Sequence, residues 1–142
     1  MLLVNARSDE TIASEVELAL TRTDRNRGLL GRTTFDLAAA LVISPCWSIH
    51  TAFMKFAIDV VFVDRSGRAI RIVRNLPPWR IAVAARAHAV IELPAGSLTG
   101  QDLRIGDEIR LVPPPPMHLN VLHCPPFGRW NRASVAVSAD TP

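Results

Sequence analysis

The segment that runs from Trp47 to Asp64 holds the residues best suited to chemistry in this chain. It places His50, Lys55 and Asp59 within an otherwise apolar, β-prone run, and Lys55 is the only lysine in the sequence. A polar group without a partner in such surroundings costs roughly 1–3 kcal/mol. These side chains are therefore expected either to stabilise the fold through specific partners or to form part of a site.

Asp59 is expected to be buried, because its neighbours along a predicted strand are apolar on both faces. A buried carboxylate needs a partner or a proton. Arg27 and Arg32 flank a short predicted helix and are the natural partners, since a guanidinium binds a carboxylate through two hydrogen bonds. The first interpretation is a structural ion pair that ties the helix to the sheet. A functional carboxylate that faces a pocket and an exposed position at a sheet edge are the alternatives.

Glu92 and His50 support a catalytic interpretation. His50 could act with Asp59 or Glu92 as an acid–base pair, and the two carboxylates together could form a pair of the glycosidase kind. The simpler interpretation of Glu92 is an ordinary solvent-facing or salt-bridged residue, which makes it a structural ion-pair candidate. Cys46 lies four residues before His50, a spacing that rarely brings two side chains on a strand to one point. Cys46 and Cys124 are isolated in the sequence and are predicted to be free thiols.

The sequence predicts neither a metal site nor a cofactor. Zinc sites need three or four ligands, commonly in closely spaced pairs. The cysteines and histidines of this chain are dispersed, at Cys46, His50, His88, His118, His123 and Cys124.

Aromatic and basic residues predict a binding surface. Trp79 follows two prolines in a stiff loop and precedes Arg80, and both residue types are enriched at binding hot spots. Trp47, His50 and Lys55 are expected to complete a surface for a protein partner or a small anionic ligand. Core packing of Trp79 and a merely solvated arginine face are the alternatives.

The charge distribution limits the kinds of partner. The net charge is +3 and the isoelectric point is near 9.6, which permits an anionic partner. The arginines are scattered among carboxylates, without a block of five or six like charges, and this argues against nucleic acid. No run reaches the roughly 18 apolar residues that cross a bilayer, and no leader segment follows Met1. A cytoplasmic location is therefore expected.

Short strand-like segments between Gly and Pro turns predict one all-β domain over residues 1–112, mainly antiparallel and sandwich- or barrel-like, with one short helix. The expected strands are 2–5, 11–21, 37–44, 48–54, 57–64, 68–74, 87–93 and 108–112, and the expected helix is 23–30. Four consecutive prolines at 113–116 cannot join a sheet interior and predict a semi-rigid spacer. Residues 113–142 are thus expected to form a Pro-rich, flexible tail.

Six blocks in series resemble the prokaryotic family called domain of unknown function 192. They are Arg-Gly-Leu-Leu-Gly-Arg at 27–32, Ile-His-Thr-Ala-Phe-Met at 49–54, Ile-Asp-Val-Val-Phe-Val-Asp at 58–64, Leu-Pro-Pro-Trp-Arg at 76–80, Val-Ile-Glu-Leu-Pro-Ala-Gly at 90–96 and Gly-Asp at 106–107. The resemblance covers residues 2–112 and implies a compact β-sandwich-like fold without an established activity. Many members carry a secretion signal and a Trp-Met-Lys-Asn-Thr block, both absent here, so extracytoplasmic roles are not carried over.

Two functional hypotheses follow. The first is a non-enzymatic binding or accessory module that uses the surface around Trp79. The alternative is a small enzyme that uses His50 with Asp59 or Glu92.

Overall fold

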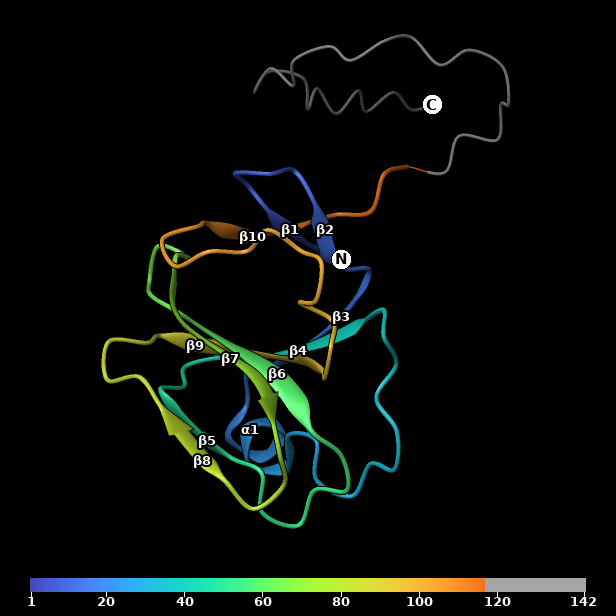
Figure 1. Cartoon of the computed structure of the whole chain (residues 1–142), viewed down its shortest axis with the longest axis vertical. Helices are drawn as coiled ribbons and strands as arrows, with labels where there is room; N and C mark the ends of the chain where they lie inside the picture. Colours follow the sequence, from blue (N-terminus) through green and yellow to red (C-terminus); the bar gives the residue numbers. More distant parts are fainter. Residues whose placement is uncertain (117–142) are drawn as a thin grey trace, which may run out of the picture.

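The computed structural model describes residues 1–116 of the chain. In this part, ten strands form three sheets, and there is one helix (Figure 1). The three-stranded sheet has the order β10 (Ile109–Val112), β1 (Leu2–Asn5) and β2 (Thr11–Ala13). The central sheet has the order β3 (Glu15–Ala19), β4 (Ala39–Ile43), β9 (Ala89–Pro94), β6 (Ile58–Val63) and β7 (Ala69–Leu76). A two-stranded ribbon pairs β5 (Ser48–His50) with β8 (Ile81–Val83), and the helix is α1 (Arg22–Arg27).

The central sheet is covered on both faces (Figure 1). The three-stranded sheet packs on one face, whereas the segment that follows α1 and the β5–β8 ribbon pack on the other. Every residue of β6 and of β9 is therefore buried. Such strands appear in a sequence as continuous apolar runs instead of alternating ones.

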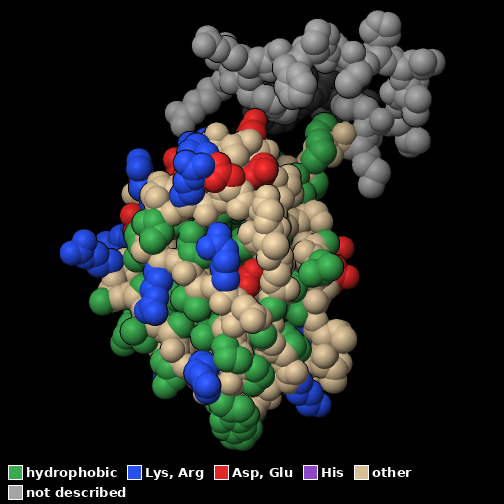
Figure 2. Space-filling model, viewed as in Figure 1, with side chains coloured by type: hydrophobic (Ala, Val, Ile, Leu, Met, Phe, Trp, Pro, Cys, Tyr) green, Lys and Arg blue, Asp and Glu red, His purple; other side chains and the backbone are tan. Residues whose placement is uncertain are grey.

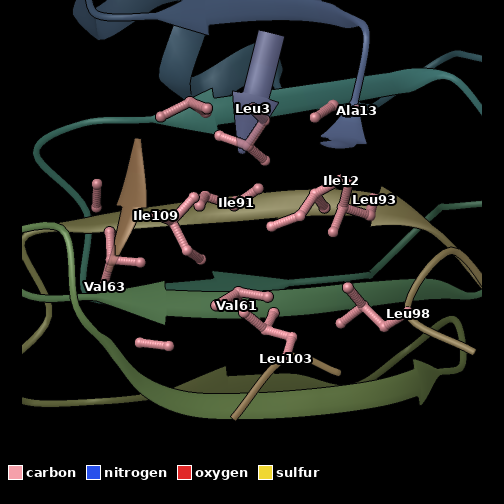
Figure 3. Close-up of a cluster of buried hydrophobic side chains, with 14 residues drawn as sticks. Leu3, Ile12, Ala13, Val61, Val63, Ile91, Leu93, Leu98, Leu103 and Ile109 are labelled. Atoms are coloured by element: carbon pink, nitrogen blue, oxygen red, sulfur yellow. The ribbon is translucent and has the colours of Figure 1, made fainter. Parts of the chain in front are cut away.

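Two hydrophobic clusters stabilise these layers. Figure 3 shows the cluster between the three-stranded and central sheets, where Leu3 and Ile109 face Val61 and Ile91. The second cluster, on the opposite face, includes Phe62. Each fully buried aliphatic or aromatic side chain contributes roughly 1.5–3 kcal/mol relative to its exposed state. The clusters fix the sheet that supports the candidate site.

The predicted class, mainly β with one short helix, is confirmed, although the sheets are mixed because β3 and β4 run parallel. The strand expected at 11–21 divides at Ser14 into β2 and β3, which belong to different sheets. The helix ends at Arg27, earlier than expected, because Gly28 has a left-handed φ of 47°. The sequence did not predict β8.

The flexible tail expected at residues 113–142 remains a prediction. Residues 113–116 follow β10 outside any strand, as four prolines require, and the rest of the expected tail lies outside the described residues. Among residues 1–116, no helix is long and apolar enough to span a membrane.

Asp59 connects three segments at one end of the central sheet. Its buried carboxylate accepts backbone hydrogen bonds from Asn75 at 2.8 Å, Gly96 at 3.1 Å and Leu98 at 3.0 Å. Asn75 lies near the end of β7, and the other two amides lie in the turn after β9. The carboxylate thus fixes both segments against β6.

The predicted ion pair of Asp59 with Arg27 or Arg32 is wrong. Within residues 1–116, no arginine forms a salt bridge with Asp59, and Arg32 instead binds Glu17 through hydrogen bonds of 2.9 and 2.6 Å. Three backbone amides satisfy the Asp59 carboxylate in place of a guanidinium.

We predict that Asp59→Ala lowers the free energy of unfolding by on the order of 3 kcal/mol, because three amides lose their acceptor. Thermal or urea denaturation measures the loss. Asp64→Ala is the matched control, since Asp64 also accepts amide hydrogen bonds, from Ser66 and Arg68, but at a partly exposed turn. Equal losses in the two variants would contradict the structural role assigned to Asp59.

Candidate functional site

A cleft of about 390 Å³ lies between the end of α1 and the chain that leads into β5. Arg25, Arg27 and Leu29 line one side, and His50 lies on the other. Glu92 reaches the cleft from β9 in the centre of the sheet. The volume falls within the range of small-molecule sites, roughly 300–1,000 Å³.

The wall next to α1 is built by the Arg-Gly-Leu-Leu-Gly-Arg block. Thr21 caps the helix by accepting a hydrogen bond from the backbone amide of Asp24, and Gly28 ends it. Gly28 and Gly31 both have positive φ, a conformation that costs other residues energy. Between them the chain turns so that Leu29 is buried in the second cluster. The block therefore turns the chain at the cleft without extending the helix.

Glu92 is the most unusual side chain of the cleft. It is only 4% exposed, and its cross-strand neighbours are Leu41 and Val60. Its Oε2 atom is buried without a hydrogen-bond partner in the described part of the chain. Burial raises the pKa of this carboxyl to about 7, against an opposing effect of the positive charge of Arg32. Natural folds contain few such groups, and they concentrate at functional sites.

Cys46 also lines the cleft, but its thiol is not activated. The thiol donates a hydrogen bond to the carbonyl oxygen of Ser48 at 3.1 Å. Burial raises the pKa of the Cys46 thiol above its usual value. A protonated thiol is a poor nucleophile. The cleft thus brings Cys46, His50 and Glu92 together without a Cys–His nucleophile, and Asp59 does not line it.

A second hollow, of about 420 Å³, lies on the other side of the turn at Gly28 and Gly31. Glu17 and Arg32 line it and neutralise each other in their ion pair. Asp24 and Arg27 also line this hollow, and within residues 1–116 neither of them forms a salt bridge. Residues 1–116 contain no group of three or more His, Cys, Asp and Glu side chains placed to hold a metal ion.

A separate surface lies on the ribbon and its adjoining loops. Phe53 is 74% exposed and Trp79 is 60% exposed, and their ring centroids are 4.6 Å apart at an interplanar angle of 60°. We call the exposed apolar residues of this region the aromatic surface. Its members are Trp47, Phe53, Trp79, Ile81 and Val83. Figure 2 shows hydrophobic side chains gathered over the lower half of the molecule, where Figure 1 places the ribbon.

Thr51 fixes the two loops that carry these rings. Its hydroxyl donates to the carbonyl oxygen of Pro77 at 2.7 Å and accepts from the amide of Arg80 at 2.9 Å. Its carbonyl oxygen accepts from the amide of Trp79 at 3.0 Å. Phe53 and Trp79 are held at φ values of 65° and 63°, which L-residues rarely adopt. The backbone, and not the aromatic contact alone, thus determines where the rings point.

Two arginines contact the aromatic surface: Arg71 donates a hydrogen bond to the carbonyl oxygen of Val83, and Arg80 donates one to that of Trp79. Other exposed cations lie near it in the sequence. The exposed cations of this region form no salt bridge within residues 1–116. They are Lys55, Arg71, Arg74, Arg80 and Arg86. In Figure 2, most visible acidic side chains lie instead in the upper half, toward the β1–β10 end. The aromatic surface therefore has an unbalanced positive charge.

The structure divides the residues predicted to bind a partner between these two regions. Trp47 and Trp79 belong to the aromatic surface, with Arg80 and Lys55 exposed nearby in sequence. His50 pairs with Ile81 in the ribbon and also lines the cleft.

Two important residues, Phe53 and Thr51, were missed by the sequence reasoning. An exposed aromatic side chain looks like a core residue in an apolar run, so Phe53 gave no distinct signal. The hydroxyl of Thr51 between apolar residues was the available indication.

The matches to known proteins agree with the fold. The family model DUF192, described as "Uncharacterized ACR, COG1430", matches residues 3–111. A UPF0127 protein of Pyrococcus horikoshii is 41% identical over 115 residues, which cover 77% of this chain and 97% of the relative. A UPF0127 protein of Thermococcus sibiricus is 32% identical over 113 residues, which cover 76% of this chain and 73% of the relative.

Two solved structures share the fold. A Novosphingobium aromaticivorans protein of unknown function matches with a TM-score of 0.62 and 23% identity, over 68% of this chain and 74% of that one. A Sinorhizobium meliloti protein described as a candidate transcription regulator matches with a TM-score of 0.66 and 22% identity, over 77% and 89% of the two chains. At this identity the likeness concerns the fold alone.

We predict that Glu92 makes stability fall as the pH rises. In the unfolded chain its carboxyl ionises at the ordinary pKa of 4.5, whereas the folded protein keeps the proton up to about 7. The folded state binds more protons between these values, so the free energy of unfolding decreases across this window by on the order of 3 kcal/mol. Glu92→Gln should remove this decrease and be more stable than wild type at pH 8.

Denaturation curves between pH 5 and 8 measure this effect. Glu15→Gln, at an exposed position of β3, should keep the wild-type dependence. Carboxyls with a lowered pKa have the opposite effect on stability. Asp107, whose pKa is lowered by Arg7, stabilises the fold at neutral pH, and this contribution is lost only as the pH falls below the ordinary pKa of 3.8. If the free energy of unfolding of Glu92→Gln changed with pH in the same way as that of wild type, the raised pKa of Glu92 would be contradicted.

Proposed function

The chain belongs to the DUF192 family, and we propose that it is a non-enzymatic binding module that engages a protein partner through the aromatic surface. One observation carries this proposal: Phe53 and Trp79 are largely exposed and are held at positive φ by the hydrogen bonds of Thr51. The family itself has no described activity, so the proposal rests on the geometry of this chain.

The energetic cost of this arrangement supports a role in binding. A residue other than glycine in the left-handed region costs of order 1–2 kcal/mol, and such residues cluster at functional sites. Phe53 and Trp79 both adopt this unfavourable backbone conformation, and both expose a large apolar side chain to water. Contiguous exposed apolar area marks interaction sites, and buried tryptophan is a frequent hot spot. A partner that covers the rings would recover the hydrophobic free energy.

The charge of the region specifies the chemistry of the partner. The cations around the aromatic surface have no carboxylate partner within residues 1–116, so an acidic partner segment would complement them. Phe53 and Trp79 line neither of the two hollows described above. An apolar protein segment with acidic flanks therefore fits better than a small anion.

The second candidate is a small enzyme with an acid–base pair. The observation in its favour is that His50 and Glu92 line one cleft and that burial raises the pKa of Glu92 to about 7, a suitable value for a general acid or base. Asp59 is a poor member of such a pair, because three amides occupy its oxygens. Turnover of a substrate that Glu92→Gln abolishes would favour this candidate.

We predict that Trp79→Gly and Phe53→Gly fold normally but bind the partner poorly. Glycine adopts a φ near 63° without strain, which offsets the lost aromatic contact of about 0.5–1.5 kcal/mol. The probes are two pools of peptides with equal apolar content, one carrying Asp and Glu at its other positions and one carrying Lys and Arg. Wild type should bind the acidic pool, and each variant should bind it at least about tenfold more weakly.

The control variant is Ile105→Ala, because Ile105 is 68% exposed in the turn before β10, away from the ribbon. It should bind the acidic pool as wild type does. Equal binding of both pools, or acidic-pool binding that Trp79→Gly leaves unchanged, would refute the proposal.

A further inference from the structure

The cleft beneath α1 combines three features that the proposed partner surface does not use. A buried carboxyl forms part of it, aliphatic side chains line its walls, and two arginines without a salt-bridge partner in residues 1–116 stand on one side. We propose that it binds a small zwitterion with an aliphatic body, whose ammonium group meets Glu92 and whose carboxylate meets Arg25 and Arg27.

Glu92 determines the hydrogen-bonding character of this ligand. The Oε2 atom is buried without a partner, in contrast to both oxygens of Asp59 on the neighbouring strand. Leu41 and Val60, which lie beside Glu92 on β4 and β6, have no side-chain donor to offer it. A group that enters the cleft and donates an N–H would satisfy this oxygen, and an ammonium group would also balance the ionised carboxylate.

The apolar walls of the cleft favour a ligand with an aliphatic body. Leu29, Ile43, Ile49 and Met54 line the cleft and belong to the second hydrophobic cluster. A branched aliphatic group would contact these side chains and release water from them. The cleft volume of about 390 Å³ accommodates one molecule of this kind and excludes a folded partner.

The arginines at the rim of the cleft favour a ligand that carries a carboxylate. Arg25 and Arg27 line the cleft, and Arg25 also donates a hydrogen bond to the carbonyl oxygen of Leu20. Arg27 forms no salt bridge within residues 1–116 and is exposed at the end of α1. A guanidinium binds a carboxylate in a planar, two-point geometry. The arginines would therefore hold the carboxylate at the solvent side while the amine points inward.

Ligand binding would move a proton. The titratable groups that share the cleft with Glu92 are Cys46 and His50, and Arg32 acts on Glu92 from beyond the turn. A carboxyl with a pKa of about 7 is half protonated at pH 7, so seating an ammonium group on it would release about half a proton. A ligand bound only through Arg27 would release none.

Calorimetry of the full chain at pH 7 tests the proposal with three related probes. They are leucine, 4-methylpentanoate, which lacks the amine, and 3-methylbutylamine, which lacks the carboxylate. Leucine should bind at least about tenfold more tightly than either fragment. Titration in two buffers of different ionisation enthalpy should show the release of about half a proton with leucine.

Two variants assign the ends of the ligand. Glu92→Gln should weaken the binding of leucine by at least about tenfold and abolish the proton release, while the affinity for 4-methylpentanoate stays unchanged. Arg27→Ala should weaken the binding of leucine and of 4-methylpentanoate but not that of 3-methylbutylamine. The control Glu15→Gln should bind all three probes as wild type does. Wild-type melting of each variant at pH 5 confirms its fold. Absence of leucine binding, equal binding of leucine and 4-methylpentanoate, or unchanged affinity in Glu92→Gln would each overturn the proposal.

Discussion

Burial of the central sheet on both faces removes water from every side chain of β6 and β9. A polar group there must be satisfied by the protein or by something that enters the fold. Asp59 and Glu92 lie on these neighbouring strands and meet the constraint differently. Asp59 has three backbone amides, whereas an oxygen of Glu92 has no partner in the described residues. One carboxylate thus serves the architecture, and the other keeps a buried oxygen without a hydrogen-bond donor in the described residues.

The ribbon and the end of α1 have a double role on the same face of this sheet. Their inner side chains, such as Ile49 and Ala82, complete the second hydrophobic cluster. Their outer parts carry the aromatic surface and the arginines of the cleft. The hydrogen bonds of Thr51 tie the loops that carry Phe53 and Trp79 to each other, so the fold itself sets the positions of these rings.

The sequence predicted the class of the fold and the burial of Asp59, because continuous apolar runs are a strong signal for strands covered on both faces. It did not predict the partners of Asp59, since backbone amides of distant turns leave no trace in residue types. The sequence left the exposure of Trp79 open, because a tryptophan in a stiff loop can pack in the core or face water. In the structure its φ is 63° and its side chain is 60% exposed. The strand β8 escaped notice because three residues are too few to display a period.

Burial of the sheet on both faces leaves the Glu92 carboxyl without a hydrogen-bond partner for Oε2 and raises its pKa well above the ordinary value. Carbon-13 NMR of the labelled glutamate carboxyls, titrated from pH 3 to 9, measures this most directly, with Glu92→Gln assigning the resonance. The structure predicts a carboxyl that titrates near 7 and disappears in the variant. A Glu92 resonance that titrates near the ordinary value of 4.5 would contradict it.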